Sequence, residues 1–211
     1  MKLKKSDEDR ANDISAELSQ ILKGVDFLPD GVYKLLTEIS PITCVDMIPC
    51  RWHEGKWQVG LITRNTGFFK DKLWIIGGRV NIGESIQAAL DRNMKSDLMI
   101  GMNLFPGLAW NKPFLTLQYY HNPENYREPY HLPNFGHEHS KHCIALTYLV
   151  LIGDDKEVHF GSTEHGGQEA NDFNWFDIDG IPPKEMIAYG GRETTLIPAS
   201  QFLNEKYPNG A

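Results

Sequence analysis

The stretch that decides the fold is Trp74–Ile100, WIIGGRVNIGESIQAALDRNMKSDLMI. The apolar run Leu73–Ile76 is typical of a strand end, and two glycines, Gly77 and Gly78, follow it. Beyond Glu84 the apolar residues recur at helical spacing, at Ile86, Ala89, Leu90 and Met94. The stretch therefore predicts a strand, a glycine turn and a helix that brings acids back towards the turn. Backbone carbonyls beside carboxylates can hold a divalent cation, and the cation can hold a diphosphate.

The spacing of this stretch resembles the Nudix box, G-x5-E-x7-R-E-U-x-E-E-x-G-U, in which U is aliphatic. Gly78, Glu84 and Arg92 keep its frame, while Met94 and Ile100 fit the aliphatic positions. The departures from the box are Asn93, Ser96 and Asp97, which stand at its glutamates, and Met99, which stands at its glycine. Ordinary diphosphate-cleaving members use several of these acids as metal ligands. Their loss argues against plain pyrophosphohydrolase chemistry, or against catalysis altogether.

Three further segments resemble one branch of that family, the GDP-mannose mannosyl hydrolases, whose box is similarly reduced. They are Ser40–Ile48 with Asp46, Leu61–Arg64, and the glycine turn Gly77–Val80. With a match near Trp175, the resemblance covers about residues 40–180. It implies an α/β fold, a Nudix-type α/β/α sandwich with a mixed sheet. We expect this Nudix-like domain over residues 40–211, after an N-terminal helical arm over residues 1–39.

Length and composition are those of a globular protein: 211 residues, 41% hydrophobic and 23% charged, with a net charge of −7. The acidic balance argues against non-specific nucleic-acid binding. No apolar run approaches a membrane span, and no apolar signal core follows the basic start. We therefore expect a cytoplasmic protein without nucleic-acid or membrane partners. Cys44, Cys50 and Cys143 are an odd count without a CxxC pattern, which predicts reduced thiols.

The pattern of the chain predicts helices and strands on both sides of the box. The expected helices are 7–23, 29–39 and 198–206, and the expected strands are 42–48, 57–64, 101–110, 113–121, 143–152 and 173–176. The first helix carries an apolar stripe that includes Ile14 and Leu18. This stripe either packs against the sheet or forms a dimer contact. The resemblance implies a homodimer.

Residues 122–142 contain three prolines and several turn formers, and they predict a long loop or lid. The segment carries His131, His137, His139 and His142. These histidines match no metal-site spacing, so a flap that closes over a sugar or a partner subunit is favoured over a structural zinc site.

Candidate substrate contacts lie on both sides of the glycine turn. Asp46 is an acid among apolar residues of a strand and needs a partner or a ligand there. Arg64 ends the next strand and matches the catalytic arginine of the branch. Its guanidinium can bind two oxygens of a departing diphosphate. Arg79 in the glycine turn and Arg192 in a later glycine-rich turn are candidate substrate-binding residues, with a plain surface position as the alternative for Arg192.

The second chemical stretch is Thr163–Asp177, TEHGGQEANDFNWFD. In mannosyl hydrolases a Gln-His pair precedes a similar aromatic strand. The amide helps to hold the metal and the histidine is the general base. Glu169 falls on the amide position, whereas Ala170 falls on the histidine and cannot be a base. His165 or Glu164 could supply the base if the loop folds back, and His165 could equally be an ordinary loop residue.

The leading hypothesis is a hydrolase of a nucleoside diphosphate sugar such as GDP-mannose. A Mg2+ ion, with Mn2+ as an alternative, is expected at the double-glycine turn, bound by Asp97, Glu169 and a carbonyl of Gly77. Water attacks the anomeric carbon and releases sugar and nucleoside diphosphate. Two alternatives remain open. One is a conventional pyrophosphohydrolase that recruits Glu164, Glu169 and Asp172. The other is a catalytically silent binder of nucleotide-sugars or of a protein.

Overall fold

The computed structural model describes residues 5–23, 29–65, 69–101, 103–120, 135–137, 142–153, 158 and 170–211. The chain divides into two compact units, Met1–Leu36 and Thr37–Ala211. Helix α1 (Lys5–Ile21) belongs to the first unit, and α2 (Asp30–Ile39) spans the boundary. Both predicted N-terminal helices are therefore confirmed. Ile14 and Ile21 of α1 are 48% and 58% exposed, and the predicted dimer contact stays a prediction.

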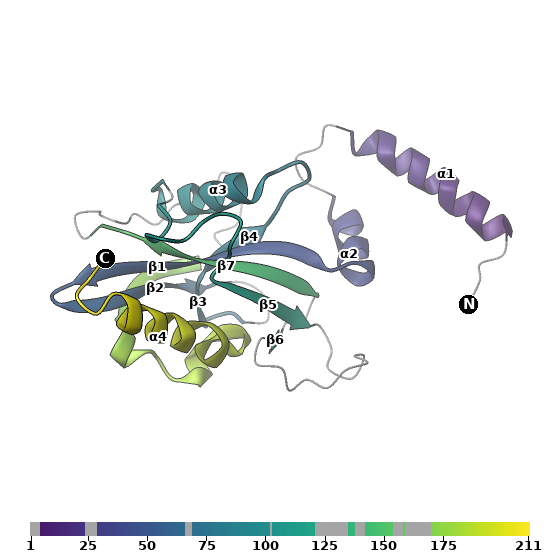
Figure 1. Cartoon of the computed structure of the whole chain (residues 1–211). Coiled ribbons are helices and arrows are strands. Elements are labelled where there is room, and N and C mark those ends of the chain that lie inside the picture. The colour runs from purple at the N-terminus through teal and green to yellow at the C-terminus, as the bar shows by residue number, and fades with distance from the viewer. Residues whose placement is uncertain are drawn as a thin grey trace. The chain divides into compact units, whose positions relative to one another are not determined.

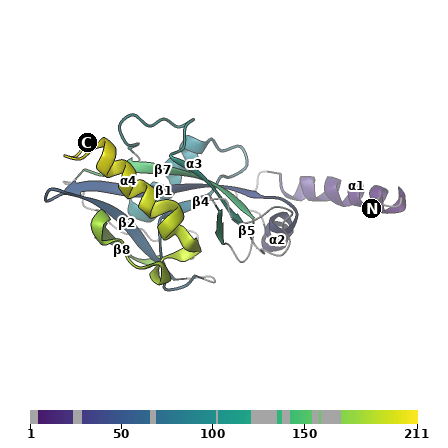
Figure 2. The same ribbon diagram turned by 60° about the horizontal axis from the view of Figure 1, so that its bottom comes forward.

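The second unit is built on one mixed sheet, as predicted. Its strands are β1 (Ile42–His53), β2 (Lys56–Arg64), β3 (Leu73–Trp74), β4 (Ile76–Arg79), β5 (Leu115–Tyr120), β6 (Phe135–His137), β7 (Cys143–Leu151) and β8 (Ala170–Asp177). The order is β3-β2-β1-β7-β5-β6, with β4 paired to β1 (Figure 1) and β8 paired to β2 (Figure 2). β1 and β7 are parallel, and β1 is antiparallel to both β2 and β4. β1 therefore joins the glycine turn to the rest of the sheet.

Two helices lie on opposite faces of this sheet, α3 (Ile86–Leu98) and α4 (Ile197–Lys206) (Figures 1 and 2). Short 3-10 turns, η2 (Ile178–Gly180), η3 (Lys184–Met186) and η4 (Ala188–Gly190), and a π-helical turn, η5 (Arg192–Leu196), lead from β8 to α4. α3 buries Ala89, Leu90, Met94 and Leu98, which include three of the four apolar positions that predicted it. The layers are those of the expected sandwich. No helix among the described residues is long and apolar enough to cross a membrane.

β1 is longer than the predicted strand 42–48 and continues to His53. Pro49 interrupts the sequence pattern, because proline has no N–H to donate to a neighbouring strand. Pro49 lies where the partner of β1 on one edge changes from β4, which pairs with residues 44–47, to β2, which pairs with residues 50–53. The hairpin to β2 turns at Glu54 and Gly55, which both have positive φ (48° and 79°). This is the backbone that a tight two-residue hairpin requires.

One predicted strand is wrong, and one short strand was not predicted. The described residues of 101–110 form turns with isolated bridges at Leu104 and Ala109, and no strand. Pro106 and Gly107 break the strand pattern there, and Gly107 has a φ of 78°. Within the predicted loop 122–142, residues 135–137 form β6, parallel to β5. Backbone pairing at a sheet edge needs no side-chain periodicity, so the pattern could not reveal it. Apart from β6 and His142, this segment lies outside the described residues, as do His131 and His139.

Met99 stands at the glycine of the box, and it ends α3 with a left-handed backbone (φ 55°). A left-handed residue at this place is a common helix end, and glycine adopts it without steric cost. The cost for a residue with a Cβ atom is about 1–2 kcal/mol. Met99 is 65% exposed, so little packing compensates for this strain. Met99 therefore adopts a backbone conformation that favours glycine, although it carries a Cβ atom.

Replacing Met99 by glycine should therefore stabilise the protein. We expect Met99→Gly to raise the free energy of unfolding by about 1 kcal/mol, which raises Tm by about 2–4 °C for a chain of this size. Met99→Ala is the matched control, because it removes the same exposed side chain and keeps the Cβ atom. Thermal unfolding of the three proteins, followed by circular dichroism, measures both effects. A glycine variant no more stable than the alanine variant would contradict the argument.

Candidate active site

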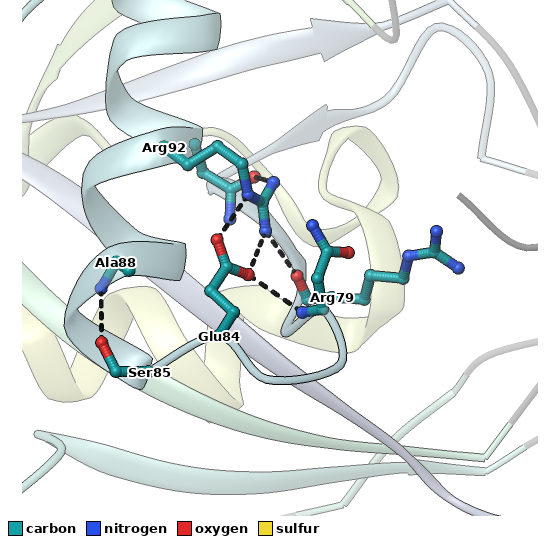
Figure 3. Close-up of polar contacts among 7 residues, drawn as sticks. Arg79, Glu84, Ser85, Ala88 and Arg92 are labelled. Carbon is teal, nitrogen blue, oxygen red and sulfur yellow. Dashed lines mark hydrogen bonds and ion pairs between the residues drawn. The ribbon is translucent and has the colours of Figure 1, made fainter. Parts of the chain in front are cut away.

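The turn between β4 and α3 is held by one arginine. Arg92 Nε and Nη2 donate to Glu84 Oε1 and Oε2, both at 2.8 Å (Figure 3). Nη2 also donates to the backbone carbonyl of Arg79 at 2.9 Å. The backbone N–H of Asn81 donates to Glu84 Oε2 at 2.9 Å. Arg92 therefore connects the helix, the loop and the end of β4, and Ser85 starts the helix by accepting from the N–H of Ala88 at 3.1 Å.

This ion pair is partly shielded from solvent, with 13% of the Glu84 side chain and 38% of the Arg92 side chain exposed. The hydrogen bonds from Arg92 lower the pKa of Glu84, although partial burial acts in the opposite direction. Glu84 likewise raises the pKa of Arg92, and the charge of Asp97 adds to that rise. The spacing of the box identified both residues without revealing that they bind one another.

Asn93 fills the place next to Arg92 on the inner face of α3. It is 7% exposed, and its Oδ1 accepts from Arg92 Nη1 at 3.0 Å. A methyl group on Gly78 would lie 2.6 Å from this oxygen, so only glycine allows the strand to approach the helix here. Asp97 lies one helical turn beyond Asn93 on the same side of α3. Asp97 is half-buried and is thus on the side of the helix that faces the double-glycine strand.

Asp46 and Gly77 are brought together directly. They are register partners in the antiparallel pair of β1 and β4. Asp46 is 7% exposed, and a Cβ atom on Gly77 would collide with its carboxylate oxygen. The charge of Asp46 also contributes to the raised pKa of the buried Tyr119 hydroxyl, although burial is the larger cause. Asp46 therefore lies between the glycine turn and Tyr119 of β5.

Arg64 lies at the end of β2, where the pairing with β8 is irregular and Arg64 faces Ala170. Its guanidinium carbon is 5.5 Å from the ring centre of Tyr189. Tyr189 in turn contacts Phe69, Trp74 and Tyr119, with ring centres 4.3, 4.9 and 5.5 Å apart. Among the described residues, Arg64 Nε is a buried donor without a hydrogen-bond partner. Sequence reasoning missed Tyr189, whose left-handed backbone (φ 56°) within a 3-10 turn leaves no sequence pattern.

The remaining predicted residues divide into two groups. Arg192 Nε donates to the carbonyl of Pro182 at 3.1 Å, and its Nη1 lies 3.4 Å from Glu193 Oε1. The first contact links η5 to the segment that follows η2, and a substrate contact for Arg192 stays a prediction, as it does for Arg79. Glu164, His165 and Glu169 lie outside the described residues. The predicted base and one predicted metal ligand are therefore untested.

The metal-ligating side chains of the described residues do not form a complete metal site. Asp97 is the only acid left from the RE-U-x-EE core of the box, and Glu84 is engaged by Arg92. The described part of the chain holds no group of three or more His, Cys, Asp or Glu side chains that could hold a metal ion. Asp97 fits as one carboxylate ligand, and further ligands would have to come from elsewhere.

Removing the charge of Glu84 should loosen the turn. We expect Glu84→Gln to lower the free energy of unfolding by about 1–2 kcal/mol at pH 7, because Arg92 loses its charged acceptor. The pKa of Glu84 is lower in the folded protein than in the unfolded chain, so the pair contributes fully above about pH 4.3. Its contribution is lost as the pH falls through the folded-state pKa. The difference between wild type and variant should therefore shrink in acid.

Urea unfolding at pH 7 and pH 3.5 measures this difference. Asp91→Asn is the matched control on the same helix. Asp91 pairs with Lys95 at 2.6 Å on the exposed side, and the loss of such a pair should cost no more than about 0.5 kcal/mol. Equal effects of the two variants, or a Glu84→Gln effect that grows in acid, would contradict the structural role assigned to Glu84.

Similar solved structures share this architecture. A Jonesia denitrificans protein described as a candidate asymmetric diadenosine tetraphosphate (Ap4A) hydrolase has 24% sequence identity and a TM-score of 0.55, covering 76% of this chain and 93% of its own. The NUDIX domain of Shewanella oneidensis NrtR, complexed with ADP ribose, has 14% identity and a TM-score of 0.55, covering 83% and 99%. A C. elegans Ap4A hydrolase binary complex has 17% identity and a TM-score of 0.54, covering 78% and 98%.

At these identities the similarity establishes the Nudix fold and no particular substrate. A comparison with curated proteins finds no match. A family model described as "Domain of unknown function (DUF4916)" matches residues 27–196. This match begins before α2 and ends at η5, so it includes the glycine turn, Arg64 and Tyr189. The chain therefore belongs to the DUF4916 family, and its second unit has the Nudix fold.

Proposed function

We propose that the protein is a hydrolase of a nucleoside diphosphate sugar, of which GDP-mannose is the first candidate. The observation that carries this proposal is the glycine turn, which Arg92 fixes against α3 while Asp46 lies against Gly77 and Asp97 follows one turn beyond Asn93 on α3. The contacts of Arg92 with Glu84 and Arg79 are present although most acids of the box are missing. This combination favours a site that binds a phosphorylated compound with few carboxylates. A homodimer is part of the proposal only through the resemblance of the sequence.

The reaction we propose breaks the bond between the anomeric carbon and the diphosphate oxygen. A water molecule attacks the anomeric carbon, its proton passes to a base, and the electron pair of the broken bond leaves with the nucleoside diphosphate. The product is a free sugar. Glu164 and His165 are the proposed bases. This route suits the present residues, because a diphosphate is already a good leaving group and needs less activation than attack at phosphorus.

Arg64 supplies positive charge to the departing diphosphate. Its guanidinium is placed by the ring of Tyr189, and its planar donors suit two phosphate oxygens at once. Arg79 and Arg192 are proposed to contact the substrate from neighbouring turns. A bound Mg2+ or Mn2+ ion would neutralise the diphosphate, with Asp97, Glu169 and the Gly77 carbonyl as its proposed ligands. Asp46 is proposed to accept a hydrogen bond from the substrate beside Gly77.

A conventional pyrophosphohydrolase is the second candidate, and it is favoured by the fold shared with proteins described as Ap4A hydrolases. It would need recruited acids. Asp172 is a weak choice, because its Oδ1 accepts from the N–H of Phe173 at 2.9 Å and its Oδ2 accepts from Asn174 at 2.7 Å. A silent binder of the same compounds is the third candidate.

Hydrolysis in ¹⁸O-labelled water separates these candidates. GDP-mannose, ADP-ribose and Ap4A are each incubated with the protein, with Mg2+ or with EDTA, and the products are analysed by mass spectrometry. Our proposal expects labelled free mannose and unlabelled GDP. Label in a phosphate group, together with a nucleoside monophosphate, would replace it by attack at phosphorus. Saturable nucleotide binding without any turnover would leave only the binding protein.

Arg64 offers a second test of the proposal. We expect Arg64→Ala to lower kcat/KM by about 100- to 1,000-fold, because the leaving group loses its charged donor. Arg64→Lys should recover part of this loss, since lysine keeps the charge but binds one oxygen at a time. Lys206→Ala, an exposed charge removed from the end of α4, is the control and should leave kcat/KM unchanged. Full activity of the folded Arg64→Ala protein would exclude the role.

A further inference from the structure

The side-chain amide of Asn93 has its orientation fixed by its neighbour. An arginine side chain has donors only, so the atom of Asn93 that lies 3.0 Å from Arg92 Nη1 must be the carbonyl oxygen. The assignment of oxygen and nitrogen in this amide is thus set by chemistry. The amide nitrogen, Nδ2, is then on the opposite edge of the group, away from the guanidinium.

Nδ2 is a donor that lacks an acceptor. Asn93 is 7% exposed, and among the described residues Nδ2 has no hydrogen-bond partner. Buried amide donors are normally satisfied, and one left unpaired costs stability. The amide also lies close to the backbone of Gly78, since a methyl group there would be 3.1 Å from Nδ2. Nδ2 is thus a buried donor beside the glycine turn whose hydrogen bond is made by none of the described residues.

The charges around the amide indicate what that acceptor is. Arg92 lies beside Asn93, and its positive charge is balanced by the carboxylate of Glu84. A neutral amide at this position offers two N–H donors, where a carboxylate would offer only acceptors. An anionic oxygen is therefore better suited to this place than a cation is. Asp97, one turn further along the helix, carries a carboxylate and would instead favour a cation.

We propose that Asn93 Nδ2 donates a hydrogen bond directly to a phosphate oxygen of the bound nucleoside diphosphate. The diphosphate is taken from the proposed function, on which this inference rests. The bond does not require a cation between protein and phosphate. Asn93, which stands at a glutamate of the box, would thus contact the ligand itself.

The test exchanges only the donor. Asn93→Asp keeps the shape of the side chain and the acceptor for Arg92, and it replaces the NH2 group by a charged oxygen. ADP and GDP are titrated by calorimetry into the wild type and the variant, with EDTA present. We expect the variant to bind at least about 10-fold more weakly, because a hydrogen bond to a charged group is lost and a repulsion is added. Gln87→Glu, the same chemical change at an exposed position of α3, should leave the affinity unchanged.

Equal affinity of wild type and Asn93→Asp for ADP and GDP would overturn the inference, and so would a wild type that binds neither nucleotide. Side-chain ¹⁵N–¹H spectra of the wild type provide a second measurement that needs no variant. The Asn93 amide signals should shift when ADP is added, and unmoved signals at saturation would exclude the contact. Nucleotide binding that depends on Asn93 but occurs without turnover would remove the hydrolase and keep the inference.

Discussion

The guanidinium of Arg92 is the constraint on which the rest of the site depends. Its donors hold Glu84 and the carbonyl of Arg79 at the same time, so the first turns of α3 and the end of β4 cannot move independently. The pair is strong because it is bidentate and partly removed from solvent. These contacts of Arg92 are present although most acids of the box are missing. The residues of the box that hold the turn together are therefore distinct from those that would bind a metal.

Two close backbone approaches complete the arrangement. Gly77 leaves room for the carboxylate of Asp46, and Gly78 leaves room for the amide of Asn93. The two glycines are neighbours in β4, so they face opposite sides of the sheet. The acid of β1 lies against Gly77 on one face, and the amide of α3 lies against Gly78 on the other. The double glycine is therefore explained by packing, and its use in ligand binding follows from which polar groups it admits.

Much of the architecture could be predicted, because it is encoded in local patterns. The apolar spacing after Glu84 predicted α3 to within two residues of its start, and alternating or continuous apolar runs predicted β2 and β7. The contacts could not be predicted in the same way. Arg64 and Tyr189 are distant in sequence, and their approach depends on an irregular pairing in β8 and a left-handed turn. Asn93 could be identified as a departure from the box, but its unpaired donor follows only from where Arg92 points.

The arrangement of β1 has a consequence for how the chain folds. This strand is antiparallel to β2 and β4, which follow it closely, and parallel to β7, which follows only after residues 54–142. During synthesis from the N-terminus, one long edge of β1 must wait for most of the chain to emerge from the ribosome. Distant parallel pairing is slow to form, and an unpaired apolar edge invites association with other chains. Chaperones that shield strand edges would thus matter most for the interval between the emergence of β1 and that of β7.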